Sequence, residues 1–192
     1  MNPKRIANKL FTSREIGLHE MAPFIGVFHR FIQEAAVPGL LIDVADYMHV
    51  PDGPGVILIG HDVDYGIDRT GGRSGLLTVR KRAGDLDAAG LLRDTLAMAL
   101  ATAKALEEDD AVSLGFVFDE ALVAFPDRLA APNTSESAAL MAKELDATLR
   151  GIFGDGVSVA HDSADDPRRM LTLRLSGGSV DLAGLITNVE NA

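Results

Sequence analysis

The chain has no cysteine and no tryptophan, and only two of its 192 residues are tyrosine. The lack of cysteine excludes disulfides, thiolate metal sites and cysteine nucleophiles. With so few large aromatic residues, a platform that stacks sugars or nucleobases has little support. A chain with neither cysteine nor a secretory signal is typical of the cytoplasm, and we therefore expect a cytoplasmic protein.

Long apolar runs are also missing. A helix that spans a bilayer needs about 20 consecutive apolar residues, and no run in the sequence approaches that length. Near the N-terminus, the apolar pair Leu10 and Phe11 soon gives way to Arg14, which is too short a run for the apolar core of a secretory signal. The sequence therefore predicts no membrane partner.

Basic charge is scarce, and the formal net charge is −10. Residues 1–96 hold 11 Lys and Arg against 12 Asp and Glu, whereas residues 97–192 hold 7 against 16. Nucleic-acid binding depends on a basic patch that displaces counterions from phosphates. The short basic cluster over residues 80–82 is typical of the polar end of a strand, so we expect no nucleic-acid partner.

What is present is an ordinary globular composition, with 47% apolar and 24% charged residues. The length suits one domain with a proper core and is short for two. Residues 1–13 are polar and basic without a clear period, and we expect them to form a flexible N-terminal arm. Residues 14–192 are then expected to form a single α+β domain.

A helix is predicted over residues 22–36, where Phe24, Phe28 and Phe31 fall on one face at helical spacing. Pro23 suits the first turn of a helix, where its missing N–H costs no hydrogen bond. The aromatic face belongs to the core in one interpretation. In the other interpretation, it docks on a second subunit.

A hairpin is predicted from strands over residues 40–50 and 56–67, because the segment between them is rich in Pro and Gly. Both segments are rich in β-forming residues, and the more apolar face of one coincides with that of the other only if Pro51 lies opposite Val56. A slip of one residue would turn one apolar set to the other face of the sheet.

The rest of the chain continues the alternation of hairpins and helices. The glycine-rich segment 70–75 is expected to be a plain hairpin turn, although its backbone N–H groups could cradle a phosphate. The further elements are strands over 76–82, 112–118, 122–125, 157–161 and 170–175, and helices over 85–108, from an Asn133 cap to a stop at Gly154, and over 179–187.

Hairpin connections dominate this order, α-β-β-β-α-β-β-α-β-β. A parallel sheet would instead require repeated strand–helix–strand units. We therefore expect a mainly antiparallel sheet of about seven strands, with the helices packed on one face.

A first candidate site follows from the hairpin register, which places Asp46 opposite His61 on an otherwise apolar face. A carboxylate that orients an imidazole is suited to general acid–base catalysis, with His61 as the base. The alternative is a structural polar pair that fixes the register, which the sequence favours because no nucleophile lies nearby.

A second candidate site lies on the opposite face, where the same register brings together Asp43, Asp62 and Asp64. Carboxylates of this kind could bind Mg²⁺ or Ca²⁺. The alternative is that Arg80 and Arg82 of the next strand supply the counter-charge, and this is the interpretation that the sequence favours.

Two functions of different class remain open, and the sequence resembles no family closely enough to name one. The first is a non-enzymatic binding or assembly module, expected to form a homodimer through its sheet or its first helix, without a cofactor and with any small-molecule ligand unidentified. The alternative is a small enzyme, or a protein dependent on a divalent metal, built on the first hairpin with His61 and Asp46. No strong catalytic motif is present, which favours the binding module.

Overall fold

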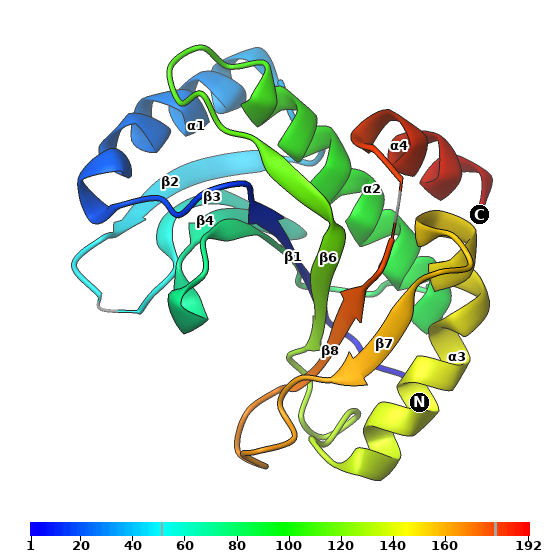
Figure 1. The fold of residues 1–192 in the computed structure, drawn as a ribbon. Helices are drawn as coiled ribbons and strands as arrows, with labels where there is room; N and C mark the ends of the chain where they lie inside the picture. Colours follow the sequence, from blue (N-terminus) through cyan, green and yellow to red (C-terminus); the bar gives the residue numbers. More distant parts are fainter. Residues whose placement is uncertain (51, 179) are drawn as a thin grey trace.

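The computed structural model describes residues 1–50, 52–178 and 180–192. Over these residues the chain forms eight strands and four α-helices (Figure 1). The strands are β1 (Ile6–Thr12), β2 (Leu41–Tyr47), β3 (Gly55–Gly60), β4 (Val63–Asp68), β5 (Gly75–Arg80), β6 (Phe116–Phe125), β7 (Ser158–His161) and β8 (Leu171–Ser176). The α-helices are α1 (Ala22–Glu34), α2 (Ala88–Glu107), α3 (Ser135–Phe153) and α4 (Leu182–Asn191), with short 3₁₀ turns η1 (Leu18–Glu20) and η2 (Thr70–Gly72).

All the described strands join one antiparallel sheet in the order β2-β3-β4-β5-β1-β6-β8-β7. The predicted fold class, α+β with an antiparallel sheet, is therefore confirmed. One transverse row takes a residue from each strand in this order: Ala45, Ile57, Gly66, Leu77, Lys9, Leu122, Arg174 and Ala160. Side chains of paired residues point to the same face, so Lys9 lies near the middle of that face.

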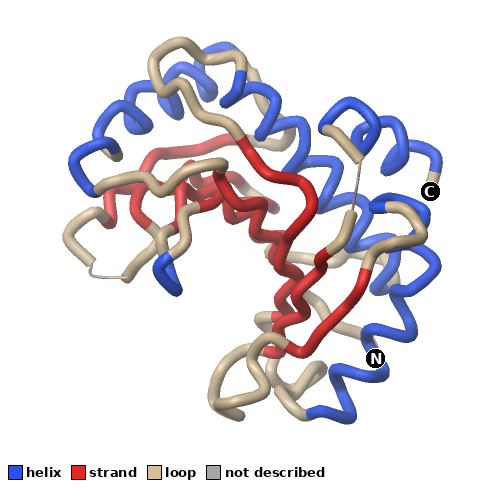
Figure 2. Tube along the Cα trace, in the orientation of Figure 1, coloured by secondary structure: helices blue, strands red, loops and turns tan. Residues whose placement is uncertain are grey.

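The described helices pack on the other face of the sheet, as predicted, and the sheet curves around the side that they leave open (Figures 1 and 2). Helix α1 packs on β2 and β3, α2 on β1 and β5, and α3 on β7 and β8. Alternate residues of each central strand supply the other half of the core, among them Leu10, Tyr65 and Val123. We call the side away from the helices the open face.

The first strand corrects the expectation of a flexible arm over residues 1–13. Strand β1 lies between β5 and β6, and all its residues are buried. The residues on both of its faces are buried, and polar residues occupy each face: Asn8 points toward the helices and Lys9 toward the open face. A strand of this kind shows no clean apolar–polar alternation, because that pattern requires one face in water.

The first hairpin has a different register from the one predicted. Val56 lies opposite Asp46, whereas Pro51 lies outside the described residues. The segment 56–67 is also not one strand, because it reverses at His61 and Asp62 to give β3 and β4. Strand β3 is apolar on both faces, so alternation could not show which of its residues face the helices.

Three further elements differ from the sequence prediction in their bounds. Strand β6 runs without a turn through residues 119 and 120. Helix α2 is capped by Asp87, whose carboxylate accepts a hydrogen bond from the Gly90 N–H at 2.7 Å. Helix α3 is capped by Thr134 and not by Asn133, although its stop at Gly154 is confirmed.

The aromatic face of α1 belongs to the core. Phe24, Phe28 and Phe31 are buried within the chain, with successive rings 6.3 and 6.1 Å apart. The helix ends where Ala35 takes a left-handed conformation. The interpretation in which these phenylalanines dock on a second subunit is therefore wrong.

Candidate functional site

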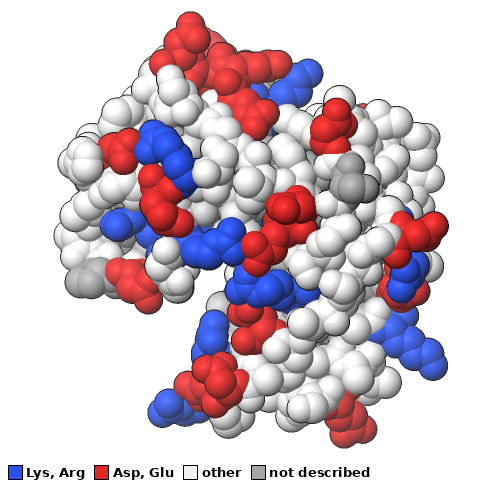
Figure 3. Space-filling view, viewed as in Figure 1, with Lys and Arg blue, Asp and Glu red and all other residues white. Residues whose placement is uncertain are grey.

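The open face carries a hollow of about 590 Å³, visible between the two lobes of the molecule in Figure 3. Its floor is formed by β1, β5 and β6. Its walls are formed by the η2 turn and by the loop between β7 and β8, which lie on either side of the open face in Figure 1. Pockets of roughly 300–1,000 Å³ are the size that small molecules occupy in proteins.

The floor is apolar and made partly of small residues. Ala7 and Leu77 come from β1 and β5, and Leu122 and Ala124 come from β6. Alanine side chains leave space above the sheet, which longer side chains at the same positions would fill. The floor therefore suits an apolar group of a ligand.

A buried ion pair stands in one wall. The Lys9 ammonium lies 2.6 Å from an oxygen of the Asp68 carboxylate, and the two side chains are only 5% and 4% exposed. The other carboxylate oxygen accepts a hydrogen bond from the Thr70 hydroxyl at 2.6 Å, and Lys9 also donates to the Thr70 carbonyl at 3.0 Å. Strand β1, the end of β4 and the η2 turn are thus joined at one point.

The path of the Lys9 side chain depends on a glycine. Gly75 lies opposite Phe11 on one side and opposite Asp68 on the other. A Cβ at this position would come within 3.0 Å of two carbons of the Lys9 stem and 2.6 Å from the Leu10 carbonyl oxygen. Glycine therefore leaves the space through which Lys9 reaches Asp68.

A network of charged groups lies beside this pair and includes a guanidinium placed on the ring of Phe11. The guanidinium of Arg73 lies 3.8 Å from the centre of the ring. Arg73 donates to Glu120 at 2.6 Å, and Arg174 also donates to Glu120. Arg174 in turn donates to Asp162 at 2.7 Å. Such cation–π and charge-assisted contacts hold each guanidinium in a fixed orientation.

This network shifts the protonation equilibria of its members. Partial burial alone would raise the pKa of Glu120, but the hydrogen bonds from Arg73 and Arg174 outweigh it and lower that pKa below its usual value. Partial burial would lower the pKa of Arg174, but its bonds to Asp162 and Glu120 outweigh that effect and raise it. Both groups are therefore charged at neutral pH.

The second wall is held in place by Asn133. Its side-chain amide donates to the carbonyl oxygens of Ser163 and Asp166 at 2.7 and 2.9 Å, and its oxygen accepts from the Ser163 hydroxyl at 2.8 Å. These bonds explain why Asn133 does not cap α3. The loop that they anchor presents Arg169 and Met170 to the hollow.

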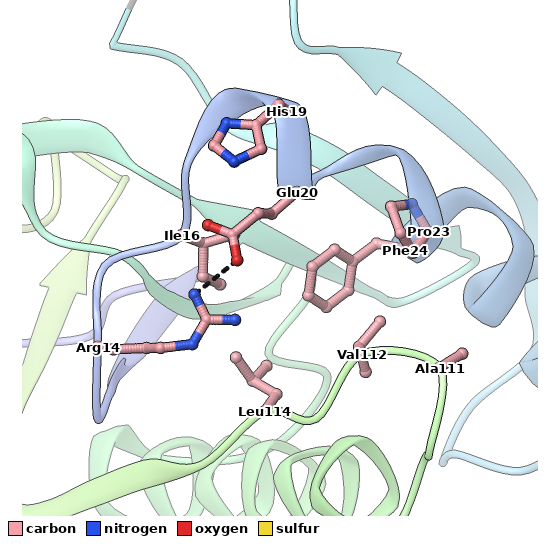
Figure 4. A pocket seen from close by; sticks show the side chains of 9 residues that line it. All are labelled: Arg14, Ile16, His19, Glu20, Pro23, Phe24, Ala111, Val112 and Leu114. Carbon is pink, nitrogen blue, oxygen red and sulfur yellow. Dashed lines mark hydrogen bonds and ion pairs between the residues drawn. The ribbon is translucent and has the colours of Figure 1, made fainter.

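A smaller hollow of about 300 Å³ lies between the segment before α1 and the segment before β6 (Figure 4). Arg14 donates to Glu20 at 2.8 Å beside it, with His19 on the same side. The Gly17 backbone N–H and then Arg14 lower the pKa of Glu20. Because the side chains of Arg14 and Glu20 are 50% and 34% exposed to water, their ion pair is weak and this hollow is a weaker candidate for a binding site.

The first predicted site is not assembled. Asp46 lies on edge strand β2, where its carboxylate accepts a hydrogen bond from the Met48 N–H at 2.8 Å. His61 lies in the turn between β3 and β4, and its imidazole is 3.1 Å from Asp62. The predicted pairing of Asp46 with His61 is therefore wrong, because it depended on a register in which residues 56–67 formed one strand.

The acids of the second predicted site also lie apart. Asp43 and Asp64 are both partners of Ile59, which separates them. Asp64 lies 2.8 Å from the Lys81 ammonium, while Asp62 lies 3.3 Å from Arg82 and has a pKa lowered mainly by its hydrogen bond with His61. No group of acids and histidines in the described part of the chain is arranged to hold a metal ion.

The predicted counter-charge for these acids is correct for one arginine and wrong for the other. Arg82 pairs with Asp62, but Arg80 points toward the helices and lies 2.9 Å from Asp94 of α2. The neighbouring Lys81 takes the place that the sequence assigned to Arg80. The side chains of a strand alternate between faces, so the basic residue on the open face is the middle one.

Sequence reasoning missed the residues that line the hollow. The sequence predicts a flexible arm around Lys9 and a plain turn around Arg73. The available signal was a lysine among Leu10, Phe11 and Ile6, which is a poor composition for a flexible arm. The sequence gave no reason to bring Asp68 or Glu120 to Lys9 and Phe11. Only the strand order places Glu120 beside β1 and Asp68 within reach of Lys9 across β5.

Comparisons with known proteins add no relationship. No protein-family model matches the chain, and no curated protein matches it. Among the described helices, none is both long enough and apolar enough to cross a bilayer.

Proposed function

We propose that the protein is a non-enzymatic binding module that takes a small molecule in the hollow of its open face. The observation that carries this proposal is the buried pair of Lys9 and Asp68, set in the wall of a hollow with an apolar floor. An apolar floor with a few fixed polar groups is the usual composition of a small-molecule site.

The cost of this pair supports a role beyond folding. Removing two charges from water costs several kcal/mol per ion, and apolar residues of similar volume are often as stable as a buried ion pair or more stable. Leu77 and Leu122 flank Lys9 in the same row of the sheet, so an apolar residue at position 9 would continue their surface. We infer that the pair serves binding indirectly, because it fixes the η2 turn, and with it the wall that carries Arg73, beside the hollow.

The alternative function, an enzyme with His61 as general base, has no comparable support. His61 lies in an exposed turn, and its expected partner Asp46 lies on a different strand and is bonded elsewhere. The imidazole instead contacts Asp62, and both side chains are about half exposed to water, an arrangement that does not position a substrate.

A neutral fluorescent probe tests the binding module. N-phenyl-1-naphthylamine fluoresces strongly in an apolar site, so the protein should enhance its emission with a stoichiometry near one. Ala124→Leu fills the floor and should abolish this site, whereas Ala45→Leu, on the same face at edge strand β2, should leave it intact. Enhancement that is absent, or equal in the two variants, would contradict the proposal.

We also propose that the protein forms a homodimer, through the edge of the sheet at β2. Leu40 is 69% exposed there, and Ile42 and Tyr47 are exposed beside it. Asp43 accepts a hydrogen bond from the Val44 backbone N–H at 2.8 Å, so that N–H already has a partner. We expect a second copy to contact this edge mainly through these exposed apolar side chains.

The oligomeric state tests this part of the proposal. Light scattering during size-exclusion chromatography should give the mass of a dimer. Leu40→Glu should reduce it to that of a monomer, whereas Leu129→Glu should not, because Leu129 is 97% exposed and lies away from the edge. A wild-type monomer, or a dimer that survives Leu40→Glu, would contradict an interface at β2.

A further inference from the structure

The charges around the hollow differ from those of the whole chain. The net charge of the protein is −10, yet basic residues outnumber acids among the described residues that line the hollow. The basic residues are Lys9, Arg73, Arg169 and Arg174, and the acids are Asp68, Asp162 and Asp165. Glu120, which pairs with Arg73 and Arg174, brings the count to four charges of each sign. The sign of the ligand's charge therefore depends on which of these groups remain free to pair.

Two of these basic groups are already committed. Lys9 donates to the Asp68 carboxylate and to the Thr70 carbonyl. Arg174 donates to both Asp162 and Glu120. Neither group can turn toward a ligand without leaving a buried or partly buried acid without its partner, which is costly.

The other two keep donors for a ligand. A guanidinium has five N–H donors. Arg73 donates one of them to Glu120 and lies on the ring of Phe11. Arg169 makes one long contact, 3.3 Å to Asp165, and both side chains are more than half exposed, so this pair is weak. Arg169 is therefore the group that can pair with an incoming anion at least cost.

We propose that the ligand of the hollow is an amphipathic carboxylate. Its apolar body lies on the floor of Ala7, Leu77, Leu122 and Ala124, and its carboxylate pairs with Arg169, with the free N–H groups of Arg73 on the opposite wall. A guanidinium binds a carboxylate through two parallel hydrogen bonds, which neither a hydroxyl nor a cation can replace. The inference rests on the proposed binding function and adds the charge and chemical class of the ligand.

Three compounds with the same ten-carbon chain separate charge from apolar contact: decanoate, decanol and decyltrimethylammonium. Each is used below its micelle concentration to displace N-phenyl-1-naphthylamine from the wild-type protein. Decanoate should displace the probe at a concentration at least about tenfold lower than decanol, the gain expected of a charge-assisted pair. Decyltrimethylammonium should be the weakest.

Neighbouring arginines in the same loop provide matched variants. Arg169→Gln should remove the preference for decanoate over decanol, whereas Arg168→Gln should keep it, because Arg168 does not line the hollow and pairs with Asp166 at 3.0 Å. Both changes remove one charge, so a general effect of net charge would appear in both.

The outcomes also distinguish a failure of the carboxylate ligand from a failure of the proposed binding function. Equal displacement by decanoate and decanol, or a preference that survives Arg169→Gln, would overturn the carboxylate ligand while the probe still reports a binding site. No enhancement of the neutral probe by the wild-type protein would overturn the binding function itself.

Discussion

The Lys9 ammonium lies 2.6 Å from the carboxylate of Asp68, a residue 59 positions further along the chain. The two residues are on strands that do not pair with each other, since β5 lies between β1 and β4. The lysine stem spans β5 above Gly75. This contact links three strands. It also fixes one wall of the hollow to the sheet.

Breaking this ion pair should destabilise the protein strongly. Lys9→Met keeps most of the apolar stem but leaves the Asp68 carboxylate buried without its partner, which typically costs about 3–5 kcal/mol. Urea denaturation at pH 7 measures the loss in the free energy of unfolding. Lys4→Met, at an exposed position just before β1, should change it by less than about 0.5 kcal/mol.

The double variant Lys9→Met with Asp68→Leu should recover much of that loss, because no buried charge then remains unpaired. A loss below about 1 kcal/mol for Lys9→Met alone would contradict a buried ion pair.

A methyl group at position 75 should displace the lysine stem. Gly75→Ala places a Cβ within 2.6 Å of the Leu10 carbonyl oxygen, and overpacking of this kind typically costs about 1–3 kcal/mol. Thermal unfolding of Gly75→Ala and of Gly66→Ala measures the difference. Gly66 lies on β4, where an added Cβ would point to the same face of the sheet. Its nearest atom would be 3.6 Å away, so Gly66→Ala should unfold close to the wild-type temperature.

The pKa of Glu120 predicts how its contribution depends on pH. Arg73 and Arg174 hold this pKa below its ordinary value of 4.5 in the folded state. The ionised carboxylate therefore stabilises the fold fully above about pH 4.5, and this contribution disappears as the pH falls through the lowered pKa.

Denaturation of wild type and Glu120→Gln at pH 6 and pH 3 measures this contribution. The difference in unfolding free energy between them should be larger at pH 6 and should shrink at pH 3. A difference that grows toward low pH would show that the network does not favour the charged form.

Two acids near the N-terminus of α2, Asp85 and Asp87, should contribute differently to stability. Asp87 accepts a hydrogen bond from the Gly90 N–H at 2.7 Å, so Asp87→Ala should cost about 1 kcal/mol in unfolding free energy. Asp85 lies before the helix and accepts no bond from the described first turn, so Asp85→Ala should cost less. Equal losses in chemical denaturation would place the cap elsewhere.

The helices could be predicted from the sequence because their apolar residues recur on one buried face. Residues 22–36, 85–108 and 179–187 each contain most of the helix that forms there. Hairpin connections likewise indicated an antiparallel sheet. These features depend on spacing within one segment.

The hollow could not be predicted because it depends on which strands are neighbours. Phe11, Arg73 and Glu120 belong to three segments, and they meet only because β1 lies between β5 and β6. The orientation of strand β3 could not be predicted either. Both of its faces are apolar, so its pattern fits either face toward the helices, and the wrong choice paired Asp46 with His61.

The position of β1 in the sheet also decides when the protein can fold. During synthesis this strand leaves the ribosome before both of its neighbours, and one of them, β6, ends only at residue 125. Until β6 is complete, β1 cannot be paired on both sides, and its apolar side chains are not fully buried. Contacts between such distant segments form slowly. Removal of β1 would separate the sheet into one piece of β2 to β5 and another of β6 to β8, so a truncation that reaches residue 12 would affect the whole sheet.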